Sequence, residues 1–152
     1  MQKRGHFNIR IYGLLFDESL TYLLITDEFR LNRFMTKFPG GGLEFGEGTI
    51  DCLKRECKEE LGQQPENLSH FYTTDFYQPT SYLDQQQQLI SIYYQGILRQ
   101  PYQFHTTDTV MDIAAKDGAQ SFRWVPPLDI EASSLSMPVD KIVLEKLQQK
   151  LK

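Results

Sequence analysis

Two apolar stretches near the N-terminus have the pattern of β-strands. Residues 7–16 begin with alternating apolar and polar positions and end in a continuous apolar run, which is typical of a strand that enters a sheet covered on both faces. A polar turn at residues 17–19 separates this stretch from a second apolar run, residues 20–26. We therefore expect the two strands to pair as a β-hairpin.

Two amphipathic helices are predicted further along the chain. Residues 49–61 carry small or apolar side chains at helical spacing, namely Ile50, Leu53, Cys57 and Leu61. Gly62 follows directly and suits the left-handed end of a helix. Residues 139–151 also repeat apolar side chains with a helical period, and they follow Pro138, a residue that favours the start of a helix.

The rest of the chain adds strands and polar loops. Residues 69–77, 89–99 and 121–125 are rich in aromatic and β-branched side chains and are predicted as strands. Residues 78–88 and 100–120 are polar and are predicted as loops. Strands that surround one central helix, with a second helix at the end, predict an α/β fold in which a mixed sheet packs between helices.

Length and composition narrow the class of protein. A chain of 152 residues with 40% hydrophobic and 24% charged residues is ordinary for one globular domain, so we expect residues 1–152 to form a single domain. No run approaches the roughly 18 apolar residues that indicate a membrane helix, and the N-terminus lacks the apolar core of a signal peptide. We therefore expect a cytoplasmic protein with no membrane partner.

Charge and cysteine content exclude two further classes. The net charge of −4 argues against an extended nucleic-acid-binding surface, although an acidic protein can still bind an anionic small molecule if cations lie between the two. Cys52 and Cys57 lie on different faces of the same predicted helix. We expect them to be buried free thiols rather than a disulfide or a zinc site.

Candidate chemistry is concentrated in residues 39–63. Three consecutive glycines precede a helix whose carboxylates at Glu56, Glu59 and Glu60 lie within one turn. Residues three and four apart share a helix face, so these carboxylates project together, and their oxygens suit Mg²⁺ or Mn²⁺. A charged helix by itself is more often a solvated surface. The glycines favour the metal site because they let the main chain pass close to a ligand.

This stretch is similar to the Nudix box, the 23-residue signature of the Nudix hydrolases, here residues 41–63. The signature is Gly, five residues, Glu, seven residues, and then Arg-Glu, an aliphatic residue, any residue, Glu-Glu, any residue, Gly and an aliphatic residue. The matching positions are Gly41, Glu47, Arg55, Glu56, Glu59, Glu60 and Gly62. Two aliphatic positions differ, because Cys57 and Gln63 stand there.

The resemblance implies a fold and a reaction. Nudix proteins form an α/β/α sandwich around a mixed sheet, and the order of the predicted elements agrees with that fold. Members of the family use divalent ions to hydrolyse a nucleoside diphosphate linked to another group, with water attacking phosphorus. The resemblance therefore implies Mg²⁺ or Mn²⁺ and a nucleotide-derivative substrate such as ADP-ribose, a sugar nucleotide or a nucleoside triphosphate. A homodimer is a further expectation, because many relatives are dimers.

The resemblance also assigns metal ligands. Glu56 and Glu60 are expected to be the main ligands, and Glu59 is expected to be a further ligand or the general base. The main-chain carbonyl of Gly40 would complete the shell of the first ion.

Catalytic support is expected from residues beside these ligands. Arg55 would orient a glutamate, most simply Glu47, through a salt bridge. Some family members add a carboxylate or a base from the loop before the last strand, where Asp117 is the best-placed candidate and Asp112 the second. Surface loops commonly carry acidic residues, so an ordinary loop role for both stays open.

Substrate contacts are expected outside the box. Residues 27–37 are predicted as a polar loop, and its cations Arg30, Arg33 and Lys37 would hold distal phosphates or a ribose phosphate. Tyr77 is a candidate to stack on a base or a ribose, although aromatic side chains in strands more often pack in the core. Neighbouring candidates of the same kind are Tyr72, Phe76 and Tyr82.

Two other functions occur on this fold. A Nudix-fold sensor binds a nucleotide derivative and regulates a partner without hydrolysing the ligand, but such modules often lose box carboxylates, and all of them are present here. An isoprenoid diphosphate isomerase needs a paired catalytic cysteine and glutamate, which Cys52 and Cys57 on the box helix do not offer.

Overall fold

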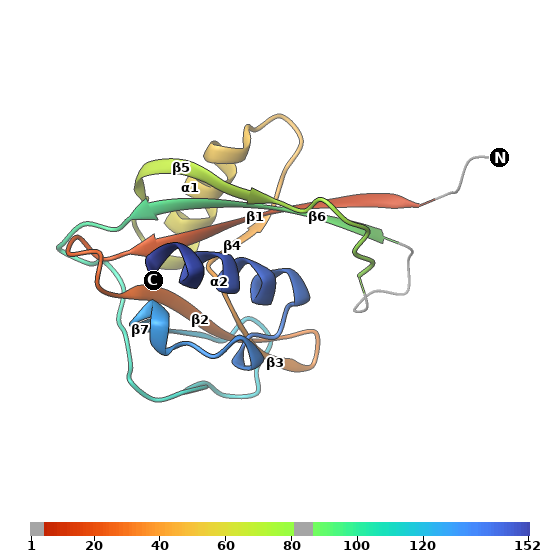
Figure 1. Cartoon of the computed structure of the whole chain (residues 1–152). Coiled ribbons are helices and arrows are strands. Elements are labelled where there is room, and N and C mark those ends of the chain that lie inside the picture. The colour runs from red at the N-terminus through yellow and green to blue at the C-terminus, as the bar shows by residue number, and fades with distance from the viewer. Residues whose placement is uncertain (1–4, 81–86) are drawn as a thin grey trace.

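The computed structural model of the chain describes residues 5–80 and 87–152, and Figure 1 shows the arrangement of its elements. In chain order these are β1 (His6–Phe16), β2 (Leu23–Arg30), β3 (Arg33–Lys37), β4 (Gly40–Gly42), α1 (Thr49–Leu61), β5 (Glu66–Thr73), β6 (Gln87–Ile97), β7 (Gln120–Val125), the 3-10 helices η1 (Pro127–Asp129) and η2 (Ala132–Ser134), and α2 (Pro138–Leu151). Tyr82 and most of the predicted loop 78–88 lie outside the described residues.

Two groups of strands form the mixed sheet. In the first, β1 lies parallel to β6 along its whole length, from His6 beside Gln87 to Phe16 beside Ile97, and β4 and β5 are the antiparallel outer strands. In the second, β3 and β7 both run antiparallel to β2. The groups meet where Phe16 pairs with Leu23. The expected hairpin of β1 and β2 is therefore present but short, because each strand turns away to pair with other neighbours.

The two helices cover opposite faces of the sheet (Figure 1), and the core explains why. On β1, Ile11 and Leu15 pack in the same cluster as the buried face of α1, whereas Tyr12 and Leu14 pack with α2. Successive side chains of a strand point to opposite faces, so an almost continuous apolar strand needs a cover on both sides. The predicted α/β/α sandwich with a mixed sheet is confirmed.

The prediction of a polar loop at residues 27–37 is wrong. β2 continues to Arg30, β3 begins at Arg33, and Leu31 and Asn32 make the tight turn between them with φ angles of 51° and 59°. Two residues with positive φ are what the common two-residue hairpin turn requires, and asparagine tolerates that conformation. Charged side chains conceal the hairpin in the sequence, because Asp27, Glu28 and Lys37 have the character of loop residues although all three are buried in ion pairs.

The helix at residues 49–61 has the predicted bounds, and Gly62 ends it in the left-handed conformation with φ 75°. The short strand β4, which periodicity did not predict, carries the glycines against β1. A Cβ atom on Gly40 would lie 2.1 Å from the carbonyl oxygen of Ile11, and its φ is 144°, so only glycine fits there. Cys52 and Cys57 are buried free thiols, as expected.

The long connection between β6 and β7 contains no helix or strand, in agreement with the predicted loop 100–120. Within residues 5–80 and 87–152, no helix is long and apolar enough to cross a membrane.

Candidate active site

The box helix α1 presents its carboxylates at two depths. Glu56 and Glu60 are partly buried, whereas Glu59 is exposed. The Glu56 carboxylate lies so close to the glycine strand that a Cβ atom on Gly41 would be 2.4 Å from its Cδ. The absence of a side chain at Gly41 therefore makes the space in which Glu56 lies.

Arg55 holds the acidic side chains of this region in place. Its Nε and Nη2 donate to the two carboxylate oxygens of Glu47 at 2.9 and 2.8 Å, which is a bidentate contact. Nη2 also donates to the carbonyl oxygen of Gly42 at 3.0 Å, and Nη1 donates to Glu56 Oε1 at 3.0 Å. Glu59 lies 3.3 Å from Nη1 on the next turn of the helix. This is the Arg55–Glu47 pairing that the resemblance implies.

The contact with Arg55 keeps Glu47 ionised. The hydrogen bonds from the guanidinium, followed by the backbone hydrogen bond at Glu44, lower the pKa of Glu47 to about 2. The same contact with Glu47 raises the pKa of Arg55. Both groups are therefore charged across the whole range in which an enzyme would work.

Glu60 has the opposite environment. Burial raises the pKa of its carboxyl group to about 7, and the neighbouring carboxylates of Glu56 and Glu28 act in the same direction, although the Lys37 ammonium opposes them. Its Oε2 atom is buried and has no hydrogen-bond partner in the described part of the chain. A buried charged oxygen without a partner is costly, so this position favours a cation or a proton.

Lys37 lies beside Glu60 rather than in a surface loop. It is the last residue of β3 and is 2% exposed. Its Nζ lies 3.7 Å from Glu28 Oε1 and donates to the carbonyl oxygen of Gly40 at 3.4 Å. The buried ammonium thus neutralises Glu28 and lies between the glycine strand and the box helix. A phosphate-binding role for Lys37 stays a prediction.

The donor atoms here fit a hard divalent cation. In residues 5–80 and 87–152, no three histidine, cysteine, aspartate or glutamate side chains are gathered as a ready-made metal site, and Glu56 and Glu59 bind Arg55 instead. Carboxylate oxygens and a main-chain carbonyl are nevertheless the ligands that Mg²⁺ and Mn²⁺ prefer. An ion bound by Glu56, Glu60 and the Gly40 carbonyl would supply the partner that Glu60 Oε2 lacks among the described residues.

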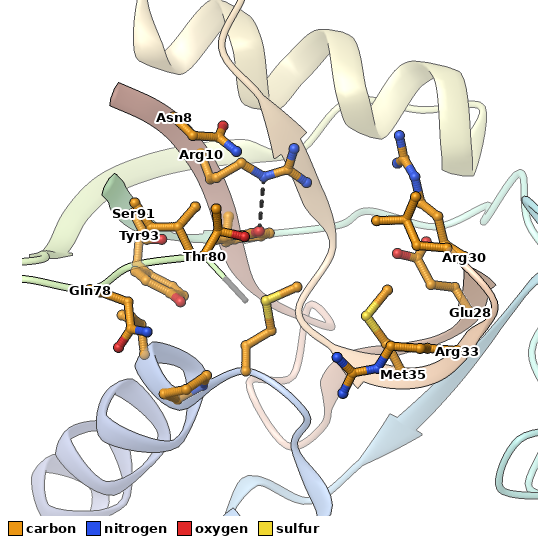
Figure 2. Close-up of a pocket in the computed structure, with 16 residues that line it drawn as sticks. Asn8, Arg10, Glu28, Arg30, Arg33, Met35, Gln78, Thr80, Ser91 and Tyr93 are labelled. Carbon is orange, nitrogen blue, oxygen red and sulfur yellow. Dashed lines mark hydrogen bonds between the residues drawn. The ribbon is translucent and has the colours of Figure 1, made fainter. Parts of the chain in front are cut away.

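A cavity of about 220 Å³ opens on the α2 face of the sheet, with Glu28 in its lining, and Figure 2 shows its walls. One wall comes from β1 and β6 and includes Asn8, Arg10 and Tyr93. The opposite wall comes from the hairpin of β2 and β3, and the start of α2 closes the bottom. Amide, hydroxyl and guanidinium groups around an aromatic and aliphatic floor are typical of a small-molecule site.

Some of the predicted substrate-binding residues line the cavity and others do not. Arg30 and Arg33 both line it from the hairpin, as a phosphate-binding role would need. Tyr77 is 69% exposed and is not among the described residues that line it. Arg10 and Glu28 line it too, and sequence reasoning missed both. The position of Arg10 two residues before Tyr12 could have indicated that both side chains line the same cavity, because alternate residues of a strand point to the same face of the sheet.

The two loop acids both accept hydrogen bonds from the protein. Asp117 is exposed, and its Oδ1 accepts a hydrogen bond of 3.1 Å from the N–H group of Leu31, in the turn of the β2–β3 hairpin. Asp112 is also exposed and accepts from the hydroxyl of Thr107 at 3.0 Å. A catalytic role for either residue stays a prediction.

The carboxylate helix, the glycine strand and the neighbouring cavity define a candidate metal-dependent phosphate site on an α/β/α fold. The sequence matches the model of the NUDIX domain over residues 6–147, and the chain therefore belongs to the NUDIX family. No curated protein sequence matches the chain significantly.

Solved structures of the same fold are distant in sequence. A MutT protein from Methanosarcina mazei Go1 is 17% identical, with a TM-score of 0.64 and coverage of 99% of both chains. A MutT structure from work on Aliivibrio salmonicida and Vibrio cholerae is 19% identical, with a TM-score of 0.65 and coverage of 95% of this chain and 98% of the other. A NUDIX hydrolase from Nitrosomonas europaea is 17% identical, with a TM-score of 0.63 and coverage of 94% and 89%. At these identities the likeness concerns the fold alone.

Proposed function

We propose that this protein is a Mg²⁺- or Mn²⁺-dependent pyrophosphohydrolase that cleaves the diphosphate linkage of a nucleoside diphosphate derivative. The observation that carries the proposal is the buried Glu60 Oε2, which has no hydrogen-bond partner among the described residues. The charges of Glu56 and of Lys37, which donates to the Gly40 carbonyl, act on the same carboxyl group. Membership of the NUDIX family supports the same reaction class.

The chain supplies the ligands and the proton acceptor for this reaction. Glu56, Glu60 and the Gly40 carbonyl would hold the ion, and Arg55 keeps Glu56 and Glu47 in fixed positions. Bound Mg²⁺ would neutralise charge on the phosphates and lower the pKa of a water molecule. The water oxygen forms a bond to phosphorus, the bond from phosphorus to the bridging oxygen breaks, and the leaving phosphate keeps the electron pair. The exposed carboxylate of Glu59 takes the proton of the water.

The cavity would hold the organic part of the substrate. Its volume of about 220 Å³ is below the roughly 300 Å³ at which drug-sized sites begin, so it accommodates one ring system rather than a whole dinucleotide. Arg30 and Arg33 would contact a distal phosphate or a ribose phosphate at the hairpin wall. The diphosphate would then lie between the cavity and α1.

Activity measurements test the proposal directly. We would assay ADP-ribose, sugar nucleotides, nucleoside triphosphates and dinucleoside polyphosphates with Mg²⁺ and with Mn²⁺. Glu60→Gln removes the ligand charge and should lower kcat at least about 100-fold, because several kcal/mol of charge stabilisation are lost. Glu145→Gln, an exposed change on α2, is the matched control and should keep full activity. Full Mg²⁺-dependent activity in Glu60→Gln would refute the assignment.

A thermal shift provides a test that does not depend on finding the substrate. An ion that binds the folded chain alone raises its stability by about 2.7 kcal/mol at 100 times the Kd. We expect Mg²⁺ or Mn²⁺ to raise the Tm of the wild type and of Glu145→Gln, but not that of Glu60→Gln. Tight nucleotide binding without turnover, in the presence of a bound ion, would favour the Nudix-fold sensor instead.

A further inference from the structure

Arg10 lies where the cavity meets the carboxylate helix. It is on β1, two residues before Tyr12, so both side chains point to the α2 face of the sheet. Its Nε donates to the Tyr12 hydroxyl at 3.1 Å, and its guanidinium carbon lies 5.8 Å from the centre of the Tyr12 ring. Figure 2 shows the guanidinium extending from this wall of the cavity toward the hairpin wall. The tyrosine therefore fixes the direction in which Arg10 presents its remaining N–H groups.

The other side of the guanidinium faces the glycine strand. Nη1 would lie 3.2 Å from a Cβ atom on Gly42, whose carbonyl oxygen is bound by Arg55. The carboxylates of Glu56 and Glu28 are near enough to act on the charge of Arg10. Arg10, like Glu28, thus lies both at the cavity and near a proposed metal ligand.

Arg10 lacks a direct counter-ion in the structure as described. Across residues 5–80 and 87–152, no ion pair forms to Arg10, although its side chain is partly buried. A partly buried cation with open N–H donors at the wall of a cavity favours an anion. A guanidinium offers two parallel donors, which match two oxygens of a phosphate.

We propose that Arg10 binds the phosphoryl group that is attached to the organic part of the substrate, and that it thereby places the adjoining anhydride bond at α1. The inference deepens the proposed function and rests on it for the position of the bond, but the phosphate contact itself needs neither turnover nor metal. Arg30 and Arg33 lie on the opposite wall, so they would contact a different part of the ligand. The phosphate at Arg10 would fix how far the ring enters the cavity.

Binding without metal tests the contact. In EDTA, the affinities of the wild type for pyrophosphate, for the four common nucleoside diphosphates and for the corresponding nucleosides would be measured by calorimetry. We expect at least one diphosphate to bind more tightly than its nucleoside. Arg10→Gln should weaken binding of that diphosphate roughly 10- to 100-fold and leave the nucleoside unchanged, because only the charged hydrogen bonds are lost. The affinity of Arg10→Lys for the diphosphate should lie between those of the wild type and Arg10→Gln, because lysine keeps the positive charge but lacks the two parallel donors of the guanidinium.

A matched variant controls for net charge. Arg99→Gln removes the same charge at an exposed site that pairs with Glu66, away from the cavity, and should bind the diphosphate like the wild type. Thermal unfolding of each variant would show that the chain is folded. An unchanged preference of Arg10→Gln for the diphosphate over the nucleoside would overturn the inference, as would failure of the folded wild type to bind any of these probes in EDTA.

The two proposals fail in different ways. If Arg10→Gln leaves KM unchanged while Glu60→Gln is inactive, the hydrolase assignment stands and the role of Arg10 is wrong. If no compound is hydrolysed by the wild type but Arg10→Gln still loses phosphate binding in EDTA, the role of Arg10 stands and the hydrolase assignment is wrong.

Discussion

The guanidinium of Arg55 binds both carboxylate oxygens of Glu47, through Nη2 at 2.8 Å and Nε at 2.9 Å, and reaches Glu56 with its remaining nitrogen. Arg55 and Glu47 are eight positions apart, with Glu47 just before α1 and Arg55 within it. One side chain thus joins the loop after the glycine strand to the carboxylates of the helix. Arg55 thereby holds the carboxylate of Glu56 as well as that of Glu47.

Arg55→Lys should separate positioning from charge. Lysine keeps the positive charge but cannot bind Glu47 through two parallel donors. Loss of a residue that orients metal ligands typically costs 10- to 100-fold, so we expect kcat to fall by about that factor while the Tm changes little. Steady-state kinetics and thermal unfolding would measure the two effects. Arg99→Lys makes the same change at an exposed ion pair and should leave kcat unaltered. Equal kcat values for the two variants would show that the bidentate contact has no catalytic role.

Alanine at the adjacent positions Gly40 and Gly41 should impair different properties of the protein. Gly41→Ala places a methyl group 2.4 Å from the Glu56 carboxylate, and a flexible side chain can move away. We expect the folded chain to persist and the Mg²⁺ concentration for half-maximal activity to rise roughly tenfold or more. Gly40→Ala instead meets the Ile11 carbonyl at 2.1 Å with φ at 144° and should destabilise the chain by roughly 3 kcal/mol or more. Denaturant unfolding and Mg²⁺ titration would distinguish them. The prediction fails if both variants unfold alike.

Asp140 should give the stability of the metal-free protein a pH dependence. It is fully buried in the first turn of α2 and accepts a hydrogen bond from Tyr93, and its Oδ2 has no partner among the described residues. Burial raises the pKa of Asp140 to about 6 from 3.8, although Tyr93 and the cations of Lys37 and Arg10 oppose the shift.

The sign follows from the raised pKa. Between pH 3.8 and about 6 the folded chain binds a proton at Asp140 that the unfolded chain has released, so this group loses stability as pH rises through the window. The loss amounts to at most about 3 kcal/mol for a shift of this size. In Asp140→Asn the loss is absent, so the free energy of unfolding of the variant relative to the wild type should rise with pH across the window. Urea unfolding at several pH values would measure it, and a constant difference would contradict the prediction.

Asp117→Ala tests whether Asp117 has a catalytic role or only stabilises the hairpin turn through its hydrogen bond. The hydrogen bond to the Leu31 N–H in the hairpin turn predicts a loss of about 1 kcal/mol of stability and a kcat within about threefold of the wild type. Asp108→Ala, an exposed change in the same loop, is the control and should alter neither quantity. A fall in kcat of more than tenfold for Asp117→Ala alone would establish the catalytic role that the resemblance implies.

How far the sequence predicts the structure depends on the range of the interactions. The bounds of α1 and its glycine end agree with the structure because a helix is specified by neighbours three and four apart. The β2–β3 hairpin was missed because several of its charged residues are buried in ion pairs, and the local sequence does not distinguish such residues from those of a surface loop. Lys37 was assigned to the predicted polar loop for the same reason. Its burial follows from Glu28 and Gly40, which strand pairing and the turn after β3 bring beside it.

The sequence by itself determined the box, since its seven residues lie at defined spacing in one continuous stretch that comprises the glycine strand, the following loop and one helix. Only the tertiary structure decided which residues lie around that box. Arg10 on β1, Arg30 on β2 and Tyr93 on β6 reach one cavity because strands from distant parts of the chain share one face of the sheet. No local pattern contains that information. Strand pairing depends on contacts between residues far apart in the sequence, and these same contacts bring the substrate-binding candidates together.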